Sequence, residues 1–355
     1  MAKILYGVSG EGSGHSSRAR LISSYLQEQG HDVKMASYDR GYRNLKDDFD
    51  VLEIAGLTIV SEDNEVSKLK TISANLANLP QGIKALDALR ELIKHFQPDC
   101  ILCDFEPCTA YLAAHYNIPL ISIDNQHRMR YMHYEIPGDF RKDAFITESI
   151  IRAMVPKPWV SLITTFHQGT LKNDHSFLFP PILRQQVLNL SSSESEHILV
   201  YVTSGFDSLV EVLKSFPREK FKLYGYNKTE QQNNIEYCEF SADGFLQDLA
   251  SSKAVIATAG FTLISEALYL GKPYLAFPMQ GQFEQQLNAF MLDKEGFGAC
   301  CDIPSVKDVA AFLYGLPDYR RALAAYPHNG NSDIQKKLDN LLANDLQGLK
   351  CYAPQ

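Results

Sequence analysis

Short apolar runs alternate with longer amphipathic stretches along the chain, which is typical of an α/β protein with parallel sheets. The runs are apolar almost throughout, as strands buried on both faces are. In the first half the pattern predicts strands at 3–8, 33–38, 51–54, 100–104, 120–124 and 161–166. It also predicts helices at 16–29, 83–96 and 109–116.

A change of texture divides the chain into two halves. Residues 179–184 carry two consecutive prolines and are stiff and extended, and residues 191–196 are polar and turn-rich. The alternation then restarts, with strands expected at 198–203, 222–226, 235–240, 254–258 and 274–277. The fold class predicted is α/β, with two doubly wound Rossmann-like domains facing across a cleft. We place the N-terminal domain at 1–180 and the C-terminal domain at 181–333, and expect a helix within 334–355 to pack back on the first.

Composition narrows the function classes. The chain has 355 residues, enough for two domains, and a net charge of −8, which disfavours a nucleic-acid platform. No apolar run approaches the roughly 20 residues that span a bilayer. The first residues lead straight into a strand, so we expect no signal peptide and a cytoplasmic protein.

The seven cysteines are odd in number, which favours reduced thiols. Cys100 and Cys103 have the spacing of a redox or zinc pair. They fall inside an apolar strand pattern, however, and no second pair accompanies them. Buried core thiols are therefore the favoured interpretation, and we expect no metal site.

A glycine-rich loop follows the first strand and ends in a histidine, Gly10-Glu-Gly12-Ser-Gly14-His15. Its spacing matches neither a dinucleotide fingerprint nor a Walker motif. His15 falls at the start of the next helix, where the positive helix end disfavours an imidazolium. A neutral imidazole there is a candidate general base. The alternative is that His15 only caps the helix.

The most informative segment lies between residues 254 and 288. A buried strand runs into the turn Ala259-Gly260, and a helix opens with Thr262 in its first turn. The free N–H groups and the positive end of such a helix suit a diphosphate. One turn further on, Glu266 is placed to accept both hydroxyls of a ribose. Beyond the strand 274–277 follows a polar cluster suited to sugar hydroxyls, at Gln280, Gln282, Glu284, Gln285 and Gln286.

Together these two segments resemble the GT-B glycosyltransferases. The segment 257–288 is similar to the donor-binding segment of the group that contains the lipid II-forming UDP-N-acetylglucosaminyltransferase, whose C-terminal domain is of the family 28 type. The run from Asp124 to Arg130 resembles an uncharacterised bacterial and archaeal branch of these enzymes. The resemblance implies a UDP- or dTDP-sugar as substrate, inversion at the anomeric carbon, and neither cofactor nor catalytic metal.

The resemblance also implies roles for particular residues. Glu266 would hold the donor ribose, and the loop from Ser241 to Phe245 would lie beside the uracil. Contacts to the diphosphate would come from Gly260, Phe261 and Thr262, and contacts to the transferred sugar from Gln285 and Gln286. His15 would deprotonate the acceptor hydroxyl, beside Gly12, Ser13 and Gly14.

Related plant-type enzymes pair their histidine with an aspartate that follows a later strand, and Asp104 has a comparable place. A carboxylate bonded to one imidazole nitrogen fixes the tautomer and stabilises the charged form. Asp104 could instead cap the helix that starts near Pro107. Glu106 and Asp124 are rival partners for His15.

The acceptor side is less well defined. Basic and aromatic residues alternate at 124–135, and we favour acceptor contacts by His127, Arg128 and Arg130 over a solvated surface helix. Leu76, Leu79 and Ile83 would meet a membrane surface or, more simply, the core. The loop at Ser204-Gly205 has one glycine where the lipid II-forming group has several.

The leading hypothesis is a metal-independent inverting glycosyltransferase with an unknown acceptor, which is a glycan, a lipid-linked molecule or a small molecule. Peripheral contact with the inner membrane face fits a lipid-linked acceptor, and no nucleic-acid partner is expected. Two rivals share the donor site: a UDP-sugar 2-epimerase of the same fold, and a non-catalytic nucleotide-sugar-binding protein. Both His15 and Glu266 are present, which favours the enzyme over the binding protein.

Overall fold

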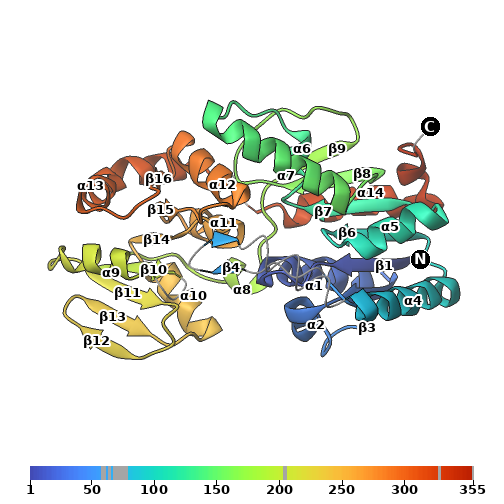
Figure 1. Cartoon of the computed structure of the whole chain (residues 1–355), viewed down its shortest axis with the longest axis horizontal. Coiled ribbons are helices and arrows are strands. Elements are labelled where there is room, and N and C mark those ends of the chain that lie inside the picture. The colour runs from blue at the N-terminus through green and yellow to red at the C-terminus, as the bar shows by residue number, and fades with distance from the viewer. Residues whose placement is uncertain (57–60, 63–64, 67–78, 203–205, 327–328, 354–355) are drawn as a thin grey trace. The chain divides into compact units, whose positions relative to one another are not determined.

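The structure, a computed structural model, describes residues 1–56, 61–62, 65–66, 79–202, 206–326 and 329–353 (Figure 1). The chain forms two compact units. Unit 1 comprises Met1–Val60, Ser67–Arg184 and Asn329–Gln355, and unit 2 comprises Ser61–Val66 and Gln185–His328. The units therefore change at residues 184/185 and 328/329, where the sequence placed boundaries near 180 and 333.

Unit 1 is built on a seven-stranded sheet in the order β3-β2-β1-β6-β7-β8-β9. All of its neighbouring strands run parallel. The strands are β1 (Lys3–Val8), β2 (Asp32–Ser37), β3 (Val51–Glu53), β6 (Cys100–Asp104), β7 (Leu120–Asp124), β8 (Val160–Thr164) and β9 (Ser176–Phe179). The order reverses between β1 and β6, and ligands in such sheets bind beyond the carboxyl ends at that point.

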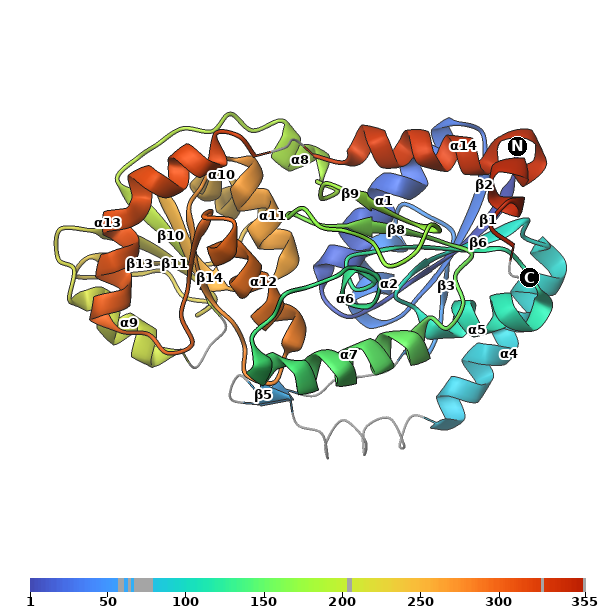
Figure 2. The ribbon, with the colours of Figure 1, turned by 90° about the horizontal axis from the view of Figure 1, so that it is seen from above.

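Helices cover both faces of this sheet (Figure 2). The helices α1 (Ser13–Glu28) and α14 (Asn331–Lys350) pack on the residues Ile4, Tyr6 and Val8 of β1. The helices α4 (Leu79–Phe96) and α5 (Pro107–Tyr116) pack on the opposite face, with Leu5. Residues next to each other in β1 therefore face different helix layers. The remaining described helices are α2 (Asp39–Leu45), α6 (Arg128–Tyr131), the 3₁₀ turn η1 (Gly138–Phe140) and α7 (Arg141–Met154).

Cys100 and Cys103 also belong to opposite faces of the sheet. Both are buried and reduced, and burial raises the pKa of the Cys100 thiol to about 12. The prediction of core thiols is confirmed, since side chains that point to opposite faces cannot share a ligand.

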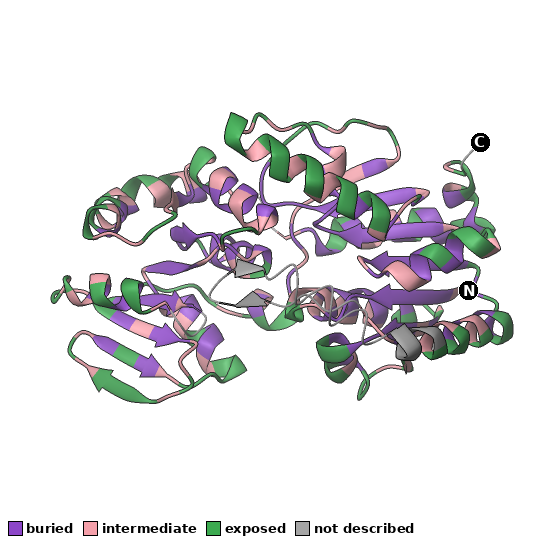
Figure 3. Ribbon diagram, in the orientation of Figure 1, coloured by how far each residue is buried: buried purple, intermediate pink, exposed green. Residues whose placement is uncertain are grey.

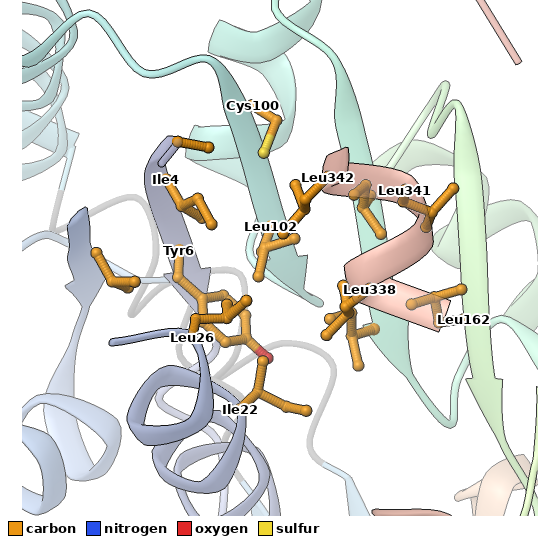
Figure 4. Packing of buried hydrophobic residues seen from close by; sticks show 14 of the residues in the cluster. Ile4, Tyr6, Ile22, Leu26, Cys100, Leu102, Leu162, Leu338, Leu341 and Leu342 are labelled. Atoms are coloured by element: carbon orange, nitrogen blue, oxygen red, sulfur yellow. The ribbon is translucent and has the colours of Figure 1, made fainter. Parts of the chain in front are cut away.

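Helix α14 brings the end of the chain back to unit 1. Its residues Leu338, Leu341 and Leu342 join the cluster that contains Ile4 and Leu102 (Figure 4). At its start, the Asn331 side chain exchanges two hydrogen bonds with the backbone of Leu183, at 2.9 and 2.8 Å. The predicted helix at the C-terminal end is thus present, and it is part of the unit 1 core.

Unit 2 is a second doubly wound sheet, in the order β12-β13-β11-β10-β14-β15-β16. Its strands are β10 (His197–Tyr201), β11 (Lys220–Tyr224), β12 (Glu230–Gln232), β13 (Ile235–Cys238), β14 (Ala254–Thr258), β15 (Tyr274–Phe277) and β16 (Gly298–Cys300). Neighbouring strands are parallel except β12, which runs antiparallel to β13. The helices are α8 (Gln185–Leu188), α9 (Asp207–Lys214), α10 (Ala242–Ser251), α11 (Phe261–Tyr269), α12 (Phe283–Lys294) and α13 (Val306–Leu323). The two-residue strands β4 (Ser61–Glu62) and β5 (Glu65–Val66) pair separately.

The predicted central strands of both sheets are present, and they are buried (Figure 3). Besides the short pair β4 and β5, three strands of the two main sheets escaped prediction, β9, β12 and β16. Each lies at or next to an edge of its sheet, where one neighbour is missing and an apolar run is short. Several helices also escaped prediction, namely α2, α7, α9, α12 and α13. In α7 most residues are exposed and only Ile151 is fully buried, so its apolar pattern is weak.

Replacing Leu338 with Ala tests whether α14 stabilises unit 1. Leu338 is fully buried in the unit 1 core, so we expect a loss of about 2–5 kcal/mol of unfolding free energy in urea titrations. Lys336→Ala on the same helix is the control, since Lys336 is exposed and its replacement should change the midpoint little. Equal midpoints for Leu338→Ala and the control would show that the helix contributes no stability to unit 1.

Candidate functional site

The glycine loop holds His15 at the beginning of α1. Gly12 precedes the helix with φ 74°, in the left-handed region where glycine is favoured. Helix α1 therefore begins at Ser13, three residues before its predicted start, and His15 stands in its first turn. The Ser9 N–H donates to the Asp104 carbonyl oxygen at 2.9 Å, which ties the loop to the end of β6.

His15 contacts one of its three candidate partners. Its Nδ1 lies 2.6 Å from Oδ1 of Asp104. The Asp104 side chain is fully buried, while the His15 side chain is 11% exposed. Because an ionised carboxylate only accepts, this bond assigns the proton to Nδ1 and leaves the lone pair on Nε2.

Arg18 grips the same carboxylate from one turn further along α1. Its Nε donates to Oδ2 of Asp104 and its second terminal nitrogen donates to Oδ1, both at 2.7 Å. Burial alone would lower the pKa of Arg18, but the Asp104 charge and the hydrogen bonds raise it above its ordinary value. Burial, aided by the Asp104 charge, raises the pKa of the nearby Tyr6 hydroxyl well above its ordinary value.

The two rival carboxylates have other partners. Glu106 caps α5, accepting hydrogen bonds from the N–H groups of Cys108 at 2.8 Å and Thr109 at 2.7 Å. The helix cap suggested for Asp104 is thus supplied by Glu106. Burial raises the pKa of Glu106 despite these bonds.

Asp124 forms a second buried aspartate–histidine pair. Its Oδ2 lies 2.6 Å from Nδ1 of His127, and its Oδ1 accepts from the His127 N–H at 2.8 Å. Burial opposes the charge of Asp124, but His127 lowers the pKa of this carboxyl below its ordinary value. Tyr131 stacks on the His127 ring at 5.5 Å. In the described part of the chain, the buried Nε2 of His127 has no hydrogen-bond partner.

The predicted acceptor-side residues lie largely inside unit 1. Arg128 is fully buried, and residues 124–129 are all buried, so the alternative of a solvated surface helix is wrong. Arg130 donates to the carbonyl oxygens of Val155 and Pro156, at 3.0 and 3.3 Å, and stacks over Tyr131. The membrane-facing candidates Leu76, Leu79 and Ile83 and the loop at Ser204-Gly205 fall outside the described backbone or side chains.

In unit 2, the turn after β14 leads into α11, whose N-cap residue is a glycine. Gly260 is the N-cap of α11, without a side-chain cap, and an added Cβ there would meet no atom within 4 Å. The Asn288 side chain donates to the Ala259 carbonyl oxygen at 2.8 Å and so fixes the turn from α12. The positive N-terminal end of α11, at Gly260 and the exposed Thr262, is therefore suited to an anion.

Glu266 lies on α11 and is only 2% exposed. At the start of α12, Gln285 accepts from the Met279 N–H at 3.1 Å and donates to Gln282 at 2.9 Å. Gln286 differs, because its buried side-chain oxygen has no hydrogen-bond partner among the described residues. Of the two predicted sugar contacts, Gln286 is the one left with a buried acceptor to satisfy.

The predicted base-binding loop precedes α10. Ser241 is exposed and caps this helix, accepting from the Gly244 N–H at 3.1 Å. Phe245 is buried among three rings, those of Tyr201, Tyr224 and Phe240. Phe240 is 54% exposed and was missed by the sequence analysis. An aromatic residue just before a helix cap was the available signal.

The remaining features of the chain are its cavities, possible metal ligands and possible membrane helices. Two cavities lie at the amino ends of the strands, around Asp99 and Pro119 in unit 1 and around His197 and Lys220 in unit 2. Among the described residues, no three His, Cys, Asp or Glu side chains are arranged to hold a metal ion. No helix in that part of the chain has the length and hydropathy to cross a membrane.

Comparison with known proteins identifies the kind of enzyme. Residues 2–317 match the family model described as glycosyl transferase family 1. An uncharacterized glycosyltransferase of Methanosarcina acetivorans is 28% identical over 328 residues, which cover 83% of this chain and 84% of the relative.

Solved structures show the same fold. The glycotransferase of kitacinnamycin superposes with a TM-score of 0.67 at 16% identity, covering 95% of this chain and 98% of the other. MurG of Acinetobacter baumannii gives 0.64 at 14% identity, covering 96% and 99%. The spinosyn rhamnosyltransferase SpnG, complexed with thymidine diphosphate, gives 0.59 at 14% identity, covering 96% and 100%.

These likenesses confirm the predicted GT-B fold class and the prediction of a glycosyltransferase. The neighbours include both MurG and antibiotic glycosyltransferases, so they do not single out the lipid II-forming group. Since the family model matches residues 2–317, the chain belongs to glycosyl transferase family 1.

Proposed function

We propose that this glycosyltransferase moves a sugar from a nucleotide diphosphate donor to an acceptor hydroxyl, with inversion and without a metal. The observation that carries the proposal is the 2.6 Å contact between His15 Nδ1 and Asp104 Oδ1. It orients the imidazole so that Nε2 is the proton acceptor, which is the arrangement of a general base.

The donor is assigned to unit 2. The positive N-terminus of α11 at Gly260, Phe261 and Thr262 receives the diphosphate, and Glu266 receives the ribose hydroxyls. Gln286 offers a buried oxygen to a sugar hydroxyl, and Gln285 holds the turn beside it. Ser241 and the rings of Phe240 and Phe245 flank the base.

The reaction is a single displacement. Nε2 of His15 takes the proton of the acceptor hydroxyl while the hydroxyl oxygen forms a bond to the anomeric carbon. The bond from that carbon to the diphosphate breaks on the opposite side, so the configuration inverts. The N-terminus of α11 stabilises the negative charge that develops on the leaving diphosphate.

The finer assignments rest on resemblance. The segment 257–288 favours UDP as the nucleotide, and thymidine diphosphate, seen bound to SpnG, is the second choice. On the acceptor side, the exposed Gly12 and Ser13 meet the acceptor beside Gly14. The buried His127 and Arg128, with Arg130, support that side from within unit 1. The acceptor is a glycan, a lipid-linked molecule or a small molecule, met in the cytoplasm or peripherally at the inner membrane face.

Replacing Glu266 with Gln tests the donor site. Loss of a charged acceptor should weaken binding of UDP-sugars by roughly 10–100-fold, measured by calorimetry. Glu211→Gln is the control, because Glu211 is an exposed carboxylate of α9 that pairs with Lys214. Since Glu266 is buried, thermal unfolding of the free variant must be measured alongside. An affinity equal to that of the control would remove Glu266 from the ribose site.

Replacing His15 with Gln tests the base. We expect UDP release in the presence of a cell-extract acceptor pool to fall roughly 10²–10⁴-fold, with donor affinity unchanged. His115→Gln, an exposed histidine of α5, is the control. Donor incubated without extract distinguishes an epimerase, which would alter the sugar without an acceptor. Turnover near the control value would exclude His15 as the base.

A further inference from the structure

Arg18 is a charged side chain beside His15 that the proposed mechanism does not use. We propose that Arg18 is a positioning residue that holds Asp104 in place and sets the pH range over which His15 is an uncharged base. The inference rests on the proposed role of His15.

The geometry makes Arg18 a clamp. It lies three residues after His15 on α1, so both side chains leave the same face of the helix. Its two 2.7 Å hydrogen bonds, one to each oxygen of Asp104, fix the plane of the carboxylate. Oδ1 is then held where it accepts from His15 Nδ1. The orientation of the imidazole therefore depends on a side chain that does not itself reach Nε2.

Arg18 also sets the net charge of the cluster that contains His15. With a neutral His15, the cluster of Arg18, Asp104 and His15 has no net charge, and protonation of His15 makes it +1. Without Arg18 the same step would take the cluster from −1 to zero. A terminal nitrogen of Arg18 also lies 3.3 Å from His15 Nδ1. Because the cluster is largely buried, these interactions are weakly screened. Arg18 therefore opposes formation of the imidazolium.

Other titratable groups around the cluster do not supply this charge. On β1, Tyr6 is neutral because burial raises the pKa of its hydroxyl. On β7, Asp124 is paired with His127. Glu11 is a further charged residue, in the loop before α1, and none of the variants described below replaces it. Arg18 is thus the group through which the charge facing His15 can be changed while its neighbours are kept.

A functional consequence follows. A histidine beside an uncompensated aspartate is a stronger base, but it is protonated over more of the neutral range. The Arg18 clamp keeps the orienting hydrogen bond of Asp104 and cancels much of its charge. Asp104 can then orient the imidazole without bringing its full negative charge to it.

The test follows the titration of the His15 imidazole by NMR in the full-length protein, with the signal assigned from its loss in His15→Gln. In Arg18→Met the midpoint should rise by about one pH unit or more, because the charge of Asp104 is no longer balanced. The acid limb of the pH–rate profile for UDP release should move up by the same amount. Arg20→Met is the matched control: Arg20 lies on the same helix but pairs with the exposed Asp48.

Two further variants separate the effect of the Arg18 charge from that of its two-pronged contact and from a loss of folding. Arg18→Lys keeps the positive charge but loses the two-pronged contact, so the midpoint should stay within about 0.3 units while kcat falls. The double variant Arg18→Met with Asp104→Asn removes both charges and leaves no buried unpaired ion. Its midpoint should return toward that of the unaltered protein, and it serves the test if Arg18→Met alone does not fold.

The outcomes distinguish this inference from the proposed function. An unmoved midpoint in Arg18→Met, or equal upward shifts in Arg18→Lys and Arg18→Met, would overturn the charge-setting role. If Arg18→Met does not fold, a double variant whose midpoint falls well below that of the unaltered protein would overturn it, because Asp104 would then have acted on His15 without being balanced by Arg18. If His15→Gln keeps its turnover while the Arg18→Met midpoint still rises, the proposed base is wrong, yet Arg18 still governs the charge of His15.

Discussion

The buried ion pair between Arg18 and Asp104 is the interaction on which the unit 1 site depends. Asp104 has no exposed surface, and an ionised carboxylate at such a position needs a compensating charge. Arg18 supplies it with two hydrogen bonds and thereby joins α1 to the end of β6. The backbone bond from Ser9 to Asp104 joins the intervening loop to the same strand. His15 is oriented because the elements on both sides of it are already fixed.

The two units share a glycine before a helix at the centre of the sheet, but they use the start of that helix differently. Each has a glycine as N-cap of the helix that follows a central strand, Gly12 before α1 and Gly260 before α11. In neither helix does the N-cap residue supply a side-chain hydrogen bond, and each helix end carries the positive partial charge of its dipole. In unit 1 the first turn carries the imidazole of His15. In unit 2 no histidine stands in the first turn of α11. The Asn288 side chain of α12 holds the preceding turn by donating to the Ala259 carbonyl oxygen. The proposed base and the proposed anion site thus occupy equivalent places in two similar folds.

The sequence predicted most of the central strands, because the strands at 3–8, 100–104, 120–124, 254–258 and 274–277 are apolar on both faces. It missed β12, whose residues Glu230–Gln232 are polar, and helix α7, whose face is mostly exposed. The glycine loop with His15 was found from the residues themselves, and Asp104 was found through a family resemblance. Arg18 was not found, because only the folded chain shows that a long charged side chain three residues after His15 turns inward. The full burial of Arg128 was not predicted either, since a basic residue is more often exposed.

Exposure decides which of the two aspartate–histidine pairs can serve as a base. Both pairs have the same 2.6 Å contact from a carboxylate oxygen to Nδ1, so hydrogen bonding alone does not separate them. The His127 side chain has no exposed surface, and Tyr131 covers one face of its ring. The His15 side chain keeps 11% of its surface exposed and sits at the end of the helix where the strand order reverses. A base must meet the acceptor hydroxyl within hydrogen-bond reach, and in this conformation His15 satisfies that condition better. His127 is then suited to hold the acceptor side in shape, with its Nε2 available to a polar group that enters the unit 1 interior.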